Sequence, residues 1–341
     1  MLFPHPLALR ATRTWLPEKH ISAREAVSYG LLDDETATDL GYRQLPVAAD
    51  APPAMAVLAA RAALTAAQVS GDAVDLLLHA WIHHQGHDLW SPAHYIAREL
   101  GVGTPPIGIQ QLCNGGAAAL ELAATRLLAD PSTATAVITT ADRFAEPGFN
   151  RWAGDYGIAY GDGATATVLT RADDGPAELY LHALATAAAP ELERMHRGDD
   201  EFSPAARWHS GTVDLRRTKK AYLTAYGMDS FVAASHRNTA AVVQRCLTEA
   251  GLAAGDPRLR AVLLPRLGAK VLHQAYVPVV QALTPAPVRI TGRDTGHLGA
   301  GDALASVAEL VAGDDLRPGD HALVVNAGAG FTWSALLVSR P

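Results

Sequence analysis

An α/β fold built from two similar halves is predicted by three observations. Apolar runs with the length of buried strands alternate along the chain with stretches typical of helices. These strands are continuous apolar runs, which is typical of mostly parallel sheets covered by helices. A strand, a glycine-rich turn and a helix follow one another around Cys113, and the same order recurs around His297.

The predicted elements follow the same plan in both halves. In the first half the strands are expected at residues 74–78, 107–112 and 136–140, with a helix at 117–128. A hairpin is predicted at 158–169, because its Asp-Gly dipeptide suits a tight turn. In the second half the strands are expected at 259–264, 322–325 and 333–338, with a helix at 302–311 and a glycine turn at 328–330.

The chain is expected to divide at about residue 172. Residues 1–172 carry the glycine-rich elbow with Cys113, and residues 173–341 carry the elbow with His297. The polar, arginine-containing stretch 190–220 has few periodic apolar positions, so it is predicted to form a cap or loop outside the sheet. Two halves packed face to face would bring both elbows to one central site.

Composition excludes several classes of protein. The chain has 341 residues, 49% of them hydrophobic and 18% charged, which is enough for a sizeable core. The net charge of −7 and the absence of long basic runs argue against nucleic acid or membrane as partners. Two cysteines make no disulfide framework, and the N-terminus has no signal-peptide pattern, so a cytoplasmic location is expected.

Cys113 has the surroundings of a nucleophile. It ends an apolar run, Gly115 and Gly116 follow closely, and a long alanine-leucine helix comes next. The free N–H groups of the first helical turn favour a thiolate at this position. A free cysteine can also be a small buried hydrophobe. The glycine elbow and the helix start favour the catalytic interpretation.

Three motifs, in this order and spacing, resemble the thiolase superfamily, and specifically β-ketoacyl-acyl carrier protein synthase III. They are the segments 113–116, 160–164 and 328–333, and the resemblance runs from about residue 8 to the end of the chain. It implies a five-layered αβαβα fold, a homodimer and no bound cofactor. It also implies that the cysteine takes an acyl group from a thioester of coenzyme A or of a phosphopantetheine carrier protein. The backbone N–H groups of Cys113 and Ala329 would form the oxyanion hole.

Two positions depart from the condensing members of this family, which use a His and an Asn to polarise the malonyl thioester. Here the His position holds Arg266, and the Asn position, 34 residues before Phe331, holds His297. An imidazole can take up a proton at neutral pH, whereas an amide cannot. Arginine stays protonated and cannot be a base, so Arg266 either binds an acidic acyl group such as malonyl or forms a structural salt bridge.

Asp302 follows His297 by five residues, at the start of the next helix. Its carboxylate can hold one ring nitrogen of the histidine, which would make Cys113, His297 and Asp302 a nucleophile, a base and an orienting group. The alternative is that Asp302 only caps the helix.

Further residues are candidates for substrate binding. Trp90 lies where the family lines its acyl pocket across the dimer interface, although a tryptophan here can also be plain packing. The stretch 26–30 lacks the tryptophan with which the family binds adenine, which favours a carrier-protein donor. Arg151 and Trp152 are alternative partners for a nucleotide. Four basic residues can dock an acidic carrier protein or form a solvated helix face: Arg216, Arg217, Lys219 and Lys220.

No metal site is predicted. The histidines His79, His83, His84 and His87 cluster in sequence, but their spacing fits no metal-ligand template.

Three hypotheses for function follow. The leading one is an acyltransferase of natural-product biosynthesis that loads Cys113 and passes the acyl group to a sugar or polyketide hydroxyl, or to a carrier-protein thiol, without forming a carbon–carbon bond. The second is a decarboxylative condensing enzyme that tolerates the two substitutions. The third is an inactive partner subunit of a heteromeric synthase, against which the intact cysteine elbow argues.

Overall fold

The computed structural model describes residues 2–341 and confirms the predicted α/β class. Ten strands form one sheet in the order β10-β9-β11-β12-β8-β1-β7-β6-β4-β5. Their bounds are β1 Leu2–Trp15, β4 Leu76–Ala80, β5 Ile107–Ile109, β6 Thr135–Asp142, β7 Gly163–Arg171, β8 Leu179–Ala188, β9 Leu259–Leu263, β10 Val288–Arg289, β11 His321–Gly328 and β12 Thr332–Ser339. Two short strands, β2 (His20–Ser22) and β3 (Gln44–Pro46), pair separately.

The sheet is mixed, whereas the apolar runs predicted a mostly parallel one. β4 pairs in parallel with β5 and β6, and β9 pairs in parallel with β10 and β11. The pairs β6–β7 and β11–β12 are antiparallel, and the antiparallel pair β1–β8 joins the two sets of five strands. Apart from β5 and β10 at the two edges, strands in both kinds of pair are buried on both faces, so their composition does not distinguish the two.

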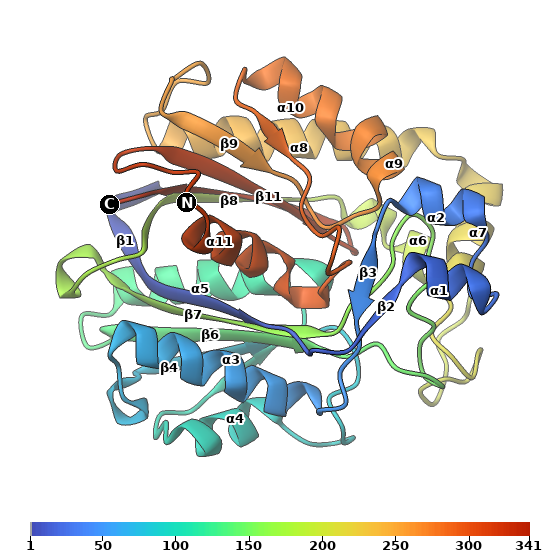
Figure 1. Cartoon of the computed structure of the whole chain (residues 1–341), viewed down its shortest axis with the longest axis horizontal. Helices are drawn as coiled ribbons and strands as arrows, with labels where there is room; N and C mark the ends of the chain where they lie inside the picture. The colour runs from blue at the N-terminus through green and yellow to red at the C-terminus, as the bar shows by residue number, and fades with distance from the viewer. Residues whose placement is uncertain (1) are drawn as a thin grey trace.

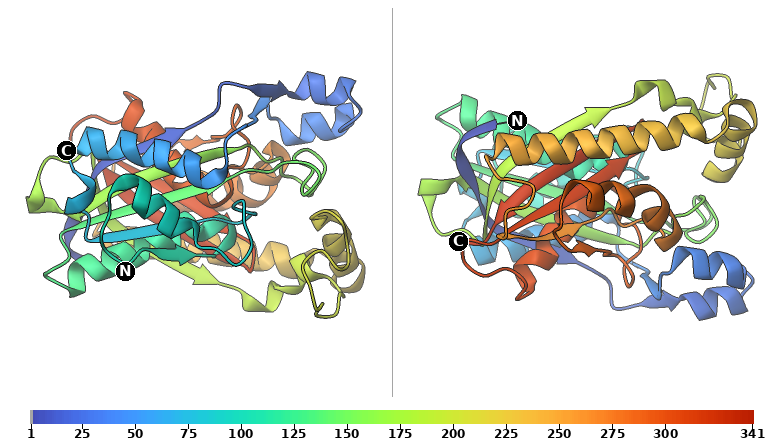
Figure 2. Two further views of the ribbon diagram at one scale, coloured as in Figure 1. Left: turned by 90° about the horizontal axis from the view of Figure 1, so that it is seen from below. Right: turned by 90° about the horizontal axis from the view of Figure 1, so that it is seen from above.

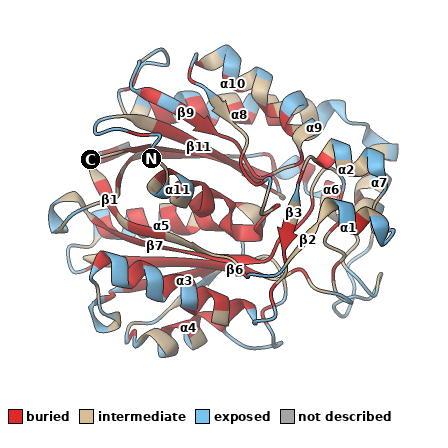
Figure 3. Ribbon diagram, in the orientation of Figure 1, coloured by how far each residue is buried: buried red, intermediate tan, exposed pale blue. Residues whose placement is uncertain are grey.

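Helices separate and cover the two halves of the sheet, which gives the predicted five layers (Figure 1). The central layer holds α5 (Gly115–Ala129) and α11 (Asp302–Ala312), whose leucines pack against strands of both halves. The outer layers hold α3 (Pro52–Ala67) with α4 (Pro92–Leu100), and α8 (Asp229–Glu249) with α10 (Val277–Leu283). Burial is greatest along the strands and the two central helices (Figure 3).

The remaining helices gather at one end of the molecule. α1 (Ala23–Ser28) and α2 (Asp34–Leu40) lie on one side of this end, and α6 (Arg194–Arg197) and α7 (Leu215–Tyr226) lie on the other side, as two views show (Figure 2). The stretch 190–220 lies at this end of the molecule, and part of it is helical. α9 (Ala269–Val271) continues through a π-helical turn, Leu272–Tyr276, into α10.

The hairpin predicted at 158–169 is wrong. Only Gly163–Arg171 is a strand, and the preceding segment is a loop that meets the second elbow instead. The carboxylate of Asp162 explains the difference, because it accepts hydrogen bonds from the backbone N–H groups of Ala48 and Phe144 rather than closing a local turn. Among the described residues, no helix has both the length and the apolar character needed to cross a bilayer.

Candidate active site

Cys113 lies in a 3-10 turn, Leu112–Asn114, directly before α5 and half-buried. Hydrogen bonds from buried polar side chains hold this turn in place. The Nδ2 of Asn326, on β11, donates to the carbonyl of Cys113 (3.0 Å) and to Oδ1 of Asn114 (3.1 Å). Asn114 in turn donates to Oγ of Ser334 on β12 (2.8 Å). The position of the thiol is therefore fixed by strands of the opposite half of the sheet.

The turn between β11 and β12 approaches the backbone of Cys113 very closely. A Cβ at Gly328 would lie 2.5 Å from the backbone nitrogen of Asn114, so this position requires glycine. The close approach places Ala329 with Cys113 in the wall of one cavity. Its role in an oxyanion hole remains a prediction.

His297 and Asp302 form a buried pair. Nδ1 of the imidazole and Oδ2 of the carboxylate are 2.5 Å apart, and both side chains are about 1% exposed. The other carboxylate oxygen accepts a hydrogen bond from the N–H of Leu298 (2.7 Å). The N-cap of α11 is Gly301, so the interpretation of Asp302 as a simple helix cap is wrong.

His297 also interacts with Cys113. Its Nε2 is buried, Cys113 lines the same cavity, and a side-chain hydrogen bond with Cys113 is one of the causes that raise the pKa of His297. Burial alone would lower the pKa of His297, but the negative charges of Asp302 and Cys113 outweigh it and raise this pKa well above 6.5. The protonated form of His297 is therefore favoured in the cavity that it shares with Cys113.

This charge interaction predicts the pH dependence of alkylation. His297→Asn removes the positive charge of the imidazolium beside Cys113, so reaction of Cys113 with iodoacetamide at pH 6 should slow roughly tenfold. Because the folded-state pKa of His297 is raised, its contribution to stability is full below pH 6.5 and is lost as the pH rises through that pKa. The stability difference between wild type and His297→Asn should therefore shrink at high pH. Equal alkylation rates in the two proteins would contradict the charge pair.

Asp142, which the sequence did not single out, ties the second elbow to the first half of the sheet. Its carboxylate accepts hydrogen bonds from the N–H groups of Ile82 (2.9 Å), His83 (2.8 Å) and Ala300 (2.9 Å). Burial raises its pKa to about 7, although the three N–H groups and His297 act in the opposite direction. The only sequence feature that could have indicated this role is that Asp142 is an acidic residue at the C-terminal end of a buried strand, β6.

One cavity of about 510 Å³ connects these residues to the surface. Cys113, His297 and Ala329 lie in it with Tyr160, whose ring meets the His297 ring edge to face at 5.2 Å between centroids. The sequence motif contained Tyr160 but gave no reason to assign it to the site. Its position there follows from backbone pairing, since the N–H of Gly161 donates to the carbonyl of His297 (3.0 Å). α6, α7 and α8 supply much of the remaining wall.

The structure does not support an acyl-binding role for Arg266. Its buried guanidinium donates to Oε1 of Glu309 (2.5 Å) and to Oγ1 of Thr295 (2.8 Å), and the residue is not part of the cavity wall. The other interpretation of Arg266, a structural salt bridge, agrees with its contact to Glu309. The backbone N–H of Arg266 also donates to the carboxylate of Asp302 (3.3 Å), the partner of His297.

Arg266→Ala should therefore reduce stability without changing donor selectivity. The loss of two buried hydrogen bonds is expected to cost about 1–3 kcal/mol in the free energy of unfolding, measured by urea denaturation. Acetyl and malonyl donors should lose activity equally. The exposed pair of Arg258 and Asp256 offers a matched control, since Arg258→Ala should leave the urea midpoint unchanged. A selective loss of malonyl transfer would restore the acyl-binding interpretation.

Arg151 and Trp152 do not form a nucleotide site. Arg151 donates to both carboxylate oxygens of Asp162 (3.1 and 3.0 Å) and to two backbone carbonyls. Trp152 is about 1% exposed and packs in an apolar cluster with Leu40, Tyr42 and Leu45. Neither residue lines the cavity, so both are structural in this chain.

Trp90 lies on the surface and not in the cavity. It is 40% exposed and contacts the rings of His87 and Tyr95. Its predicted place at the acyl pocket of a partner subunit, and the homodimer itself, remain predictions.

The four basic residues of the cap divide into two groups. Arg216 and Lys219 line the cavity, where both contact Asp155. Arg217 pairs with Asp200 on the surface, and Lys220 is exposed.

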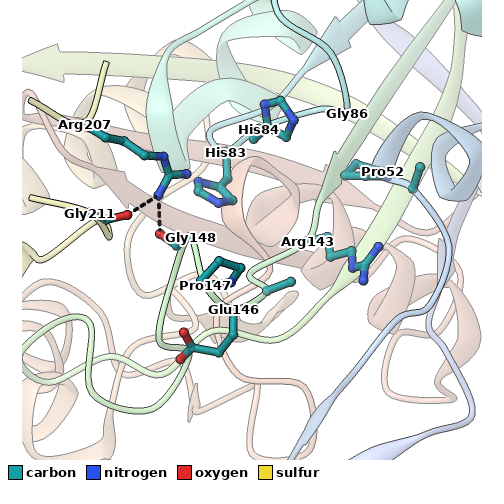
Figure 4. Close-up of a pocket in the computed structure, with 12 residues that line it drawn as sticks. Pro52, His83, His84, Gly86, Arg143, Glu146, Pro147, Gly148, Arg207 and Gly211 are labelled. Carbon is teal, nitrogen blue, oxygen red and sulfur yellow. Dashed lines mark hydrogen bonds between the residues drawn. The ribbon is translucent and has the colours of Figure 1, made fainter. Parts of the chain in front are cut away.

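A second cavity, of about 420 Å³, lies between the loops at residues 83–86, 143–148 and 207–211 (Figure 4). Arg207 and Arg143 stand on opposite sides of it in that view, and Arg207 donates to the carbonyls of Gly148 and Gly211. Neither Cys113 nor His297 lines it, so it offers no nucleophile for acyl transfer. Across residues 2–341, no three His, Cys, Asp or Glu side chains are grouped as they would be around a metal ion.

The five-layered fold with a cysteine and a His–Asp pair at its centre defines a thiolase-like enzyme. Family models for 3-oxoacyl-[acyl-carrier-protein] synthase III match residues 107–187, and those for its C-terminal part match residues 266–340. The solved structure of ChlB3, which is named as an acyltransferase, is 32% identical with a TM-score of 0.89 over 98% of both chains.

Two relatives of lower sequence identity are named as synthase III enzymes. The β-ketoacyl-[acyl-carrier-protein] synthase III of Nitratidesulfovibrio vulgaris strain DP4 is 27% identical over 98% of each chain. The 3-oxoacyl-[acyl-carrier-protein] synthase III of Aquifex aeolicus VF5 is 20% identical with a TM-score of 0.76, covering 98% of this chain and 99% of that one. The chain belongs to the thiolase superfamily, among the proteins similar to ketosynthase III.

Proposed function

We propose that this protein is an acyltransferase that forms no carbon–carbon bond. It takes an acyl group from a thioester of coenzyme A or of an acyl carrier protein onto Cys113 and transfers it to an acceptor. The acceptor is a hydroxyl of a sugar or polyketide, or the thiol of a second carrier protein. The observation that carries the proposal is the buried His297–Asp302 pair, which shares one cavity with Cys113.

The proton can be followed through both steps. His297 takes the proton of the Cys113 thiol, and the thiolate attacks the donor thioester. The donor thiol leaves with the proton from His297, while Cys113 becomes an uncharged thioester. Loss of the cysteine charge removes one of the causes of the raised pKa of His297. The neutral imidazole can then accept the acceptor proton as the hydroxyl attacks, and return it to the departing Cys113 thiolate.

Decarboxylative condensation is the alternative, and the names of the synthase III relatives favour it. The condensing members of the family that this chain resembles use a His and an Asn to polarise the malonyl thioester carbonyl. One of these positions now holds the His297–Asp302 pair, and the other holds Arg266, whose guanidinium is bound to Glu309. ChlB3, the relative with 32% identity, is named for acyl transfer, which supports our proposal.

The direct test is intact-protein mass spectrometry in two stages. The enzyme is first incubated with a panel of acyl thioesters, and the acyl-enzyme is then mixed with alcohol and thiol acceptors. We expect one added acyl group on Cys113 that persists without an acceptor and disappears when the acceptor is added. Failure of every thioester to modify Cys113 would favour the inactive-subunit hypothesis.

A further inference from the structure

The wall of the catalytic cavity contains a polar cluster that the proposed transfer does not use. Much of the wall is apolar and includes Met195, Leu223, Phe231 and Phe331. Four of its polar side chains form a group contributed by the loop before β7, by α6 and by α7. These are Asp155, Tyr160, His196 and Lys219.

An ion pair forms the centre of this cluster. The Nζ of Lys219 donates to Oδ1 of Asp155, and the hydroxyl of Tyr160 donates to Oδ2 (2.8 Å). The Asp155 side chain is 1% exposed and that of Lys219 is 12% exposed. Burying two charges is costly, and apolar side chains of similar size would often stabilise the fold as well or better. Binding of a ligand therefore explains this buried ion pair better than a contribution to the stability of the fold does.

The cluster retains unused donors and acceptors. Lys219 has three N–H donors, and Asp155 takes one of them. The oxygen of Tyr160 donates its proton to Asp155 and keeps a lone pair. Nδ1 of His196 is buried without a partner among residues 2–341, and the ring stacks at a tilt on Phe331. Burial, and then the charge of Lys219, lower the pKa of His196 to about 3, so its imidazole is neutral and offers one donor and one acceptor.

The cluster also lies next to the acylated cysteine. The ring of Tyr160 contacts that of His297, and the charge of Cys113 is one of the causes, after burial and Asp155, that raise the pKa of Tyr160. A group bound by the cluster would therefore belong to the acyl chain held on Cys113. Because Lys219 only donates while Tyr160 and His196 can accept, the best match is a group that accepts and donates at once. A hydroxyl does both, whereas a carbonyl or carboxylate only accepts.

From this arrangement we propose that the cavity selects acyl groups that carry a hydroxyl, bound by Lys219, His196 and Tyr160. This inference rests on the proposed loading of Cys113 and specifies its substrate class. The charge of Lys219 is paired with that of Asp155, so these side chains offer hydrogen bonds that a neutral hydroxyl can use.

The test compares loading rates for matched donors by intact-protein mass spectrometry. The probes are hexanoyl N-acetylcysteamine thioester and its 2-, 3- and 5-hydroxy derivatives, which carry neither a nucleotide nor a carrier protein. For wild type we expect at least one hydroxyacyl donor to load roughly ten- to a hundredfold faster than hexanoyl. Asp155→Asn combined with Lys219→Met, which removes both charges together, should reduce that preference to about twofold or less.

Two further variants make the result decisive. His196→Phe keeps the ring contact with Phe331 and should also reduce the preference, so the test does not depend on the double variant folding. Lys19→Met, at an exposed lysine outside the cavity wall, is the matched control and should keep it. Equal loading of all four donors by wild type would overturn this inference while leaving acyl transfer intact. A preference that survives in both cavity variants would also overturn it. No loading of any donor would instead count against the proposed function.

Discussion

Cys113→Ala should eliminate the acyl-enzyme and the transfer product together. The substitution removes one sulfur from a turn whose backbone is held by Asn326 and Gly328, so the fold should be retained. Without the thiolate no covalent intermediate can form, and the loss should reach the detection limit of mass spectrometry rather than a partial decrease. Circular dichroism and the urea midpoint provide the check that the protein remains folded.

Cys246 provides an internal control for this experiment. It lies in α8, where burial raises its pKa to about 12 and its thiol contacts the carbonyls of Ala183 and Ala335. Such a thiol is inert, so no acyl group should appear on it. An acylated Cys113→Ala protein, with the label on Cys246, would refute the assignment of the nucleophile.

His297→Ala should slow transfer to an alcohol acceptor by roughly 10² to 10⁴, the usual range for loss of a general base. The alcohol is a weak nucleophile, and His297 is an imidazole in the cavity of Cys113 whose ring is held by the carboxylate of Asp302. The measurement is a single-turnover rate, started from preformed acyl-enzyme so that loading is not counted. Asp302→Asn should slow transfer less than His297→Ala does, because in this proposal Asp302 only orients the His297 ring and favours its protonated form.

His297→Asn is the matched substitution for the same experiment. It restores the residue of the condensing relatives, but Arg266 remains at the other position and stays bound to Glu309. We therefore expect this variant to lose acceptor transfer and to gain no decarboxylation. Ester formation that does not change in either His297 variant would contradict the base assignment.

Local sequence was sufficient to predict the two elbows. A strand, paired glycines and an alanine-rich helix specify the surroundings of Cys113, and the same pattern identifies His297 and Asp302 five residues apart. These features depend on neighbours along the chain. The structure brings the three residues together as expected, and their catalytic roles remain proposals until the variants are measured.

The errors share a different physical cause, which is pairing between distant residues. Binding of the substrate by Arg266 was one of two expectations, but its partner Glu309 lies 43 residues away. Arg151 is a candidate partner for a nucleotide in the sequence, but its guanidinium forms an ion pair with Asp162, which lies 11 residues away. Asp155 and Lys219 were not connected at all, because 64 residues separate them. A charged residue in a sequence does not show whether its partner is a substrate or another side chain.

The most direct test of the central claim is product analysis with carbon dioxide trapping. Wild-type enzyme is incubated with malonyl and acyl thioester donors and with alcohol acceptors, the products are separated by chromatography, and released carbon dioxide is counted in parallel. We expect an ester or a new thioester, dependent on Cys113 and His297, with no carbon dioxide above the background of Cys113→Ala. A β-keto product formed with an equal amount of carbon dioxide would contradict the assignment as an acyltransferase.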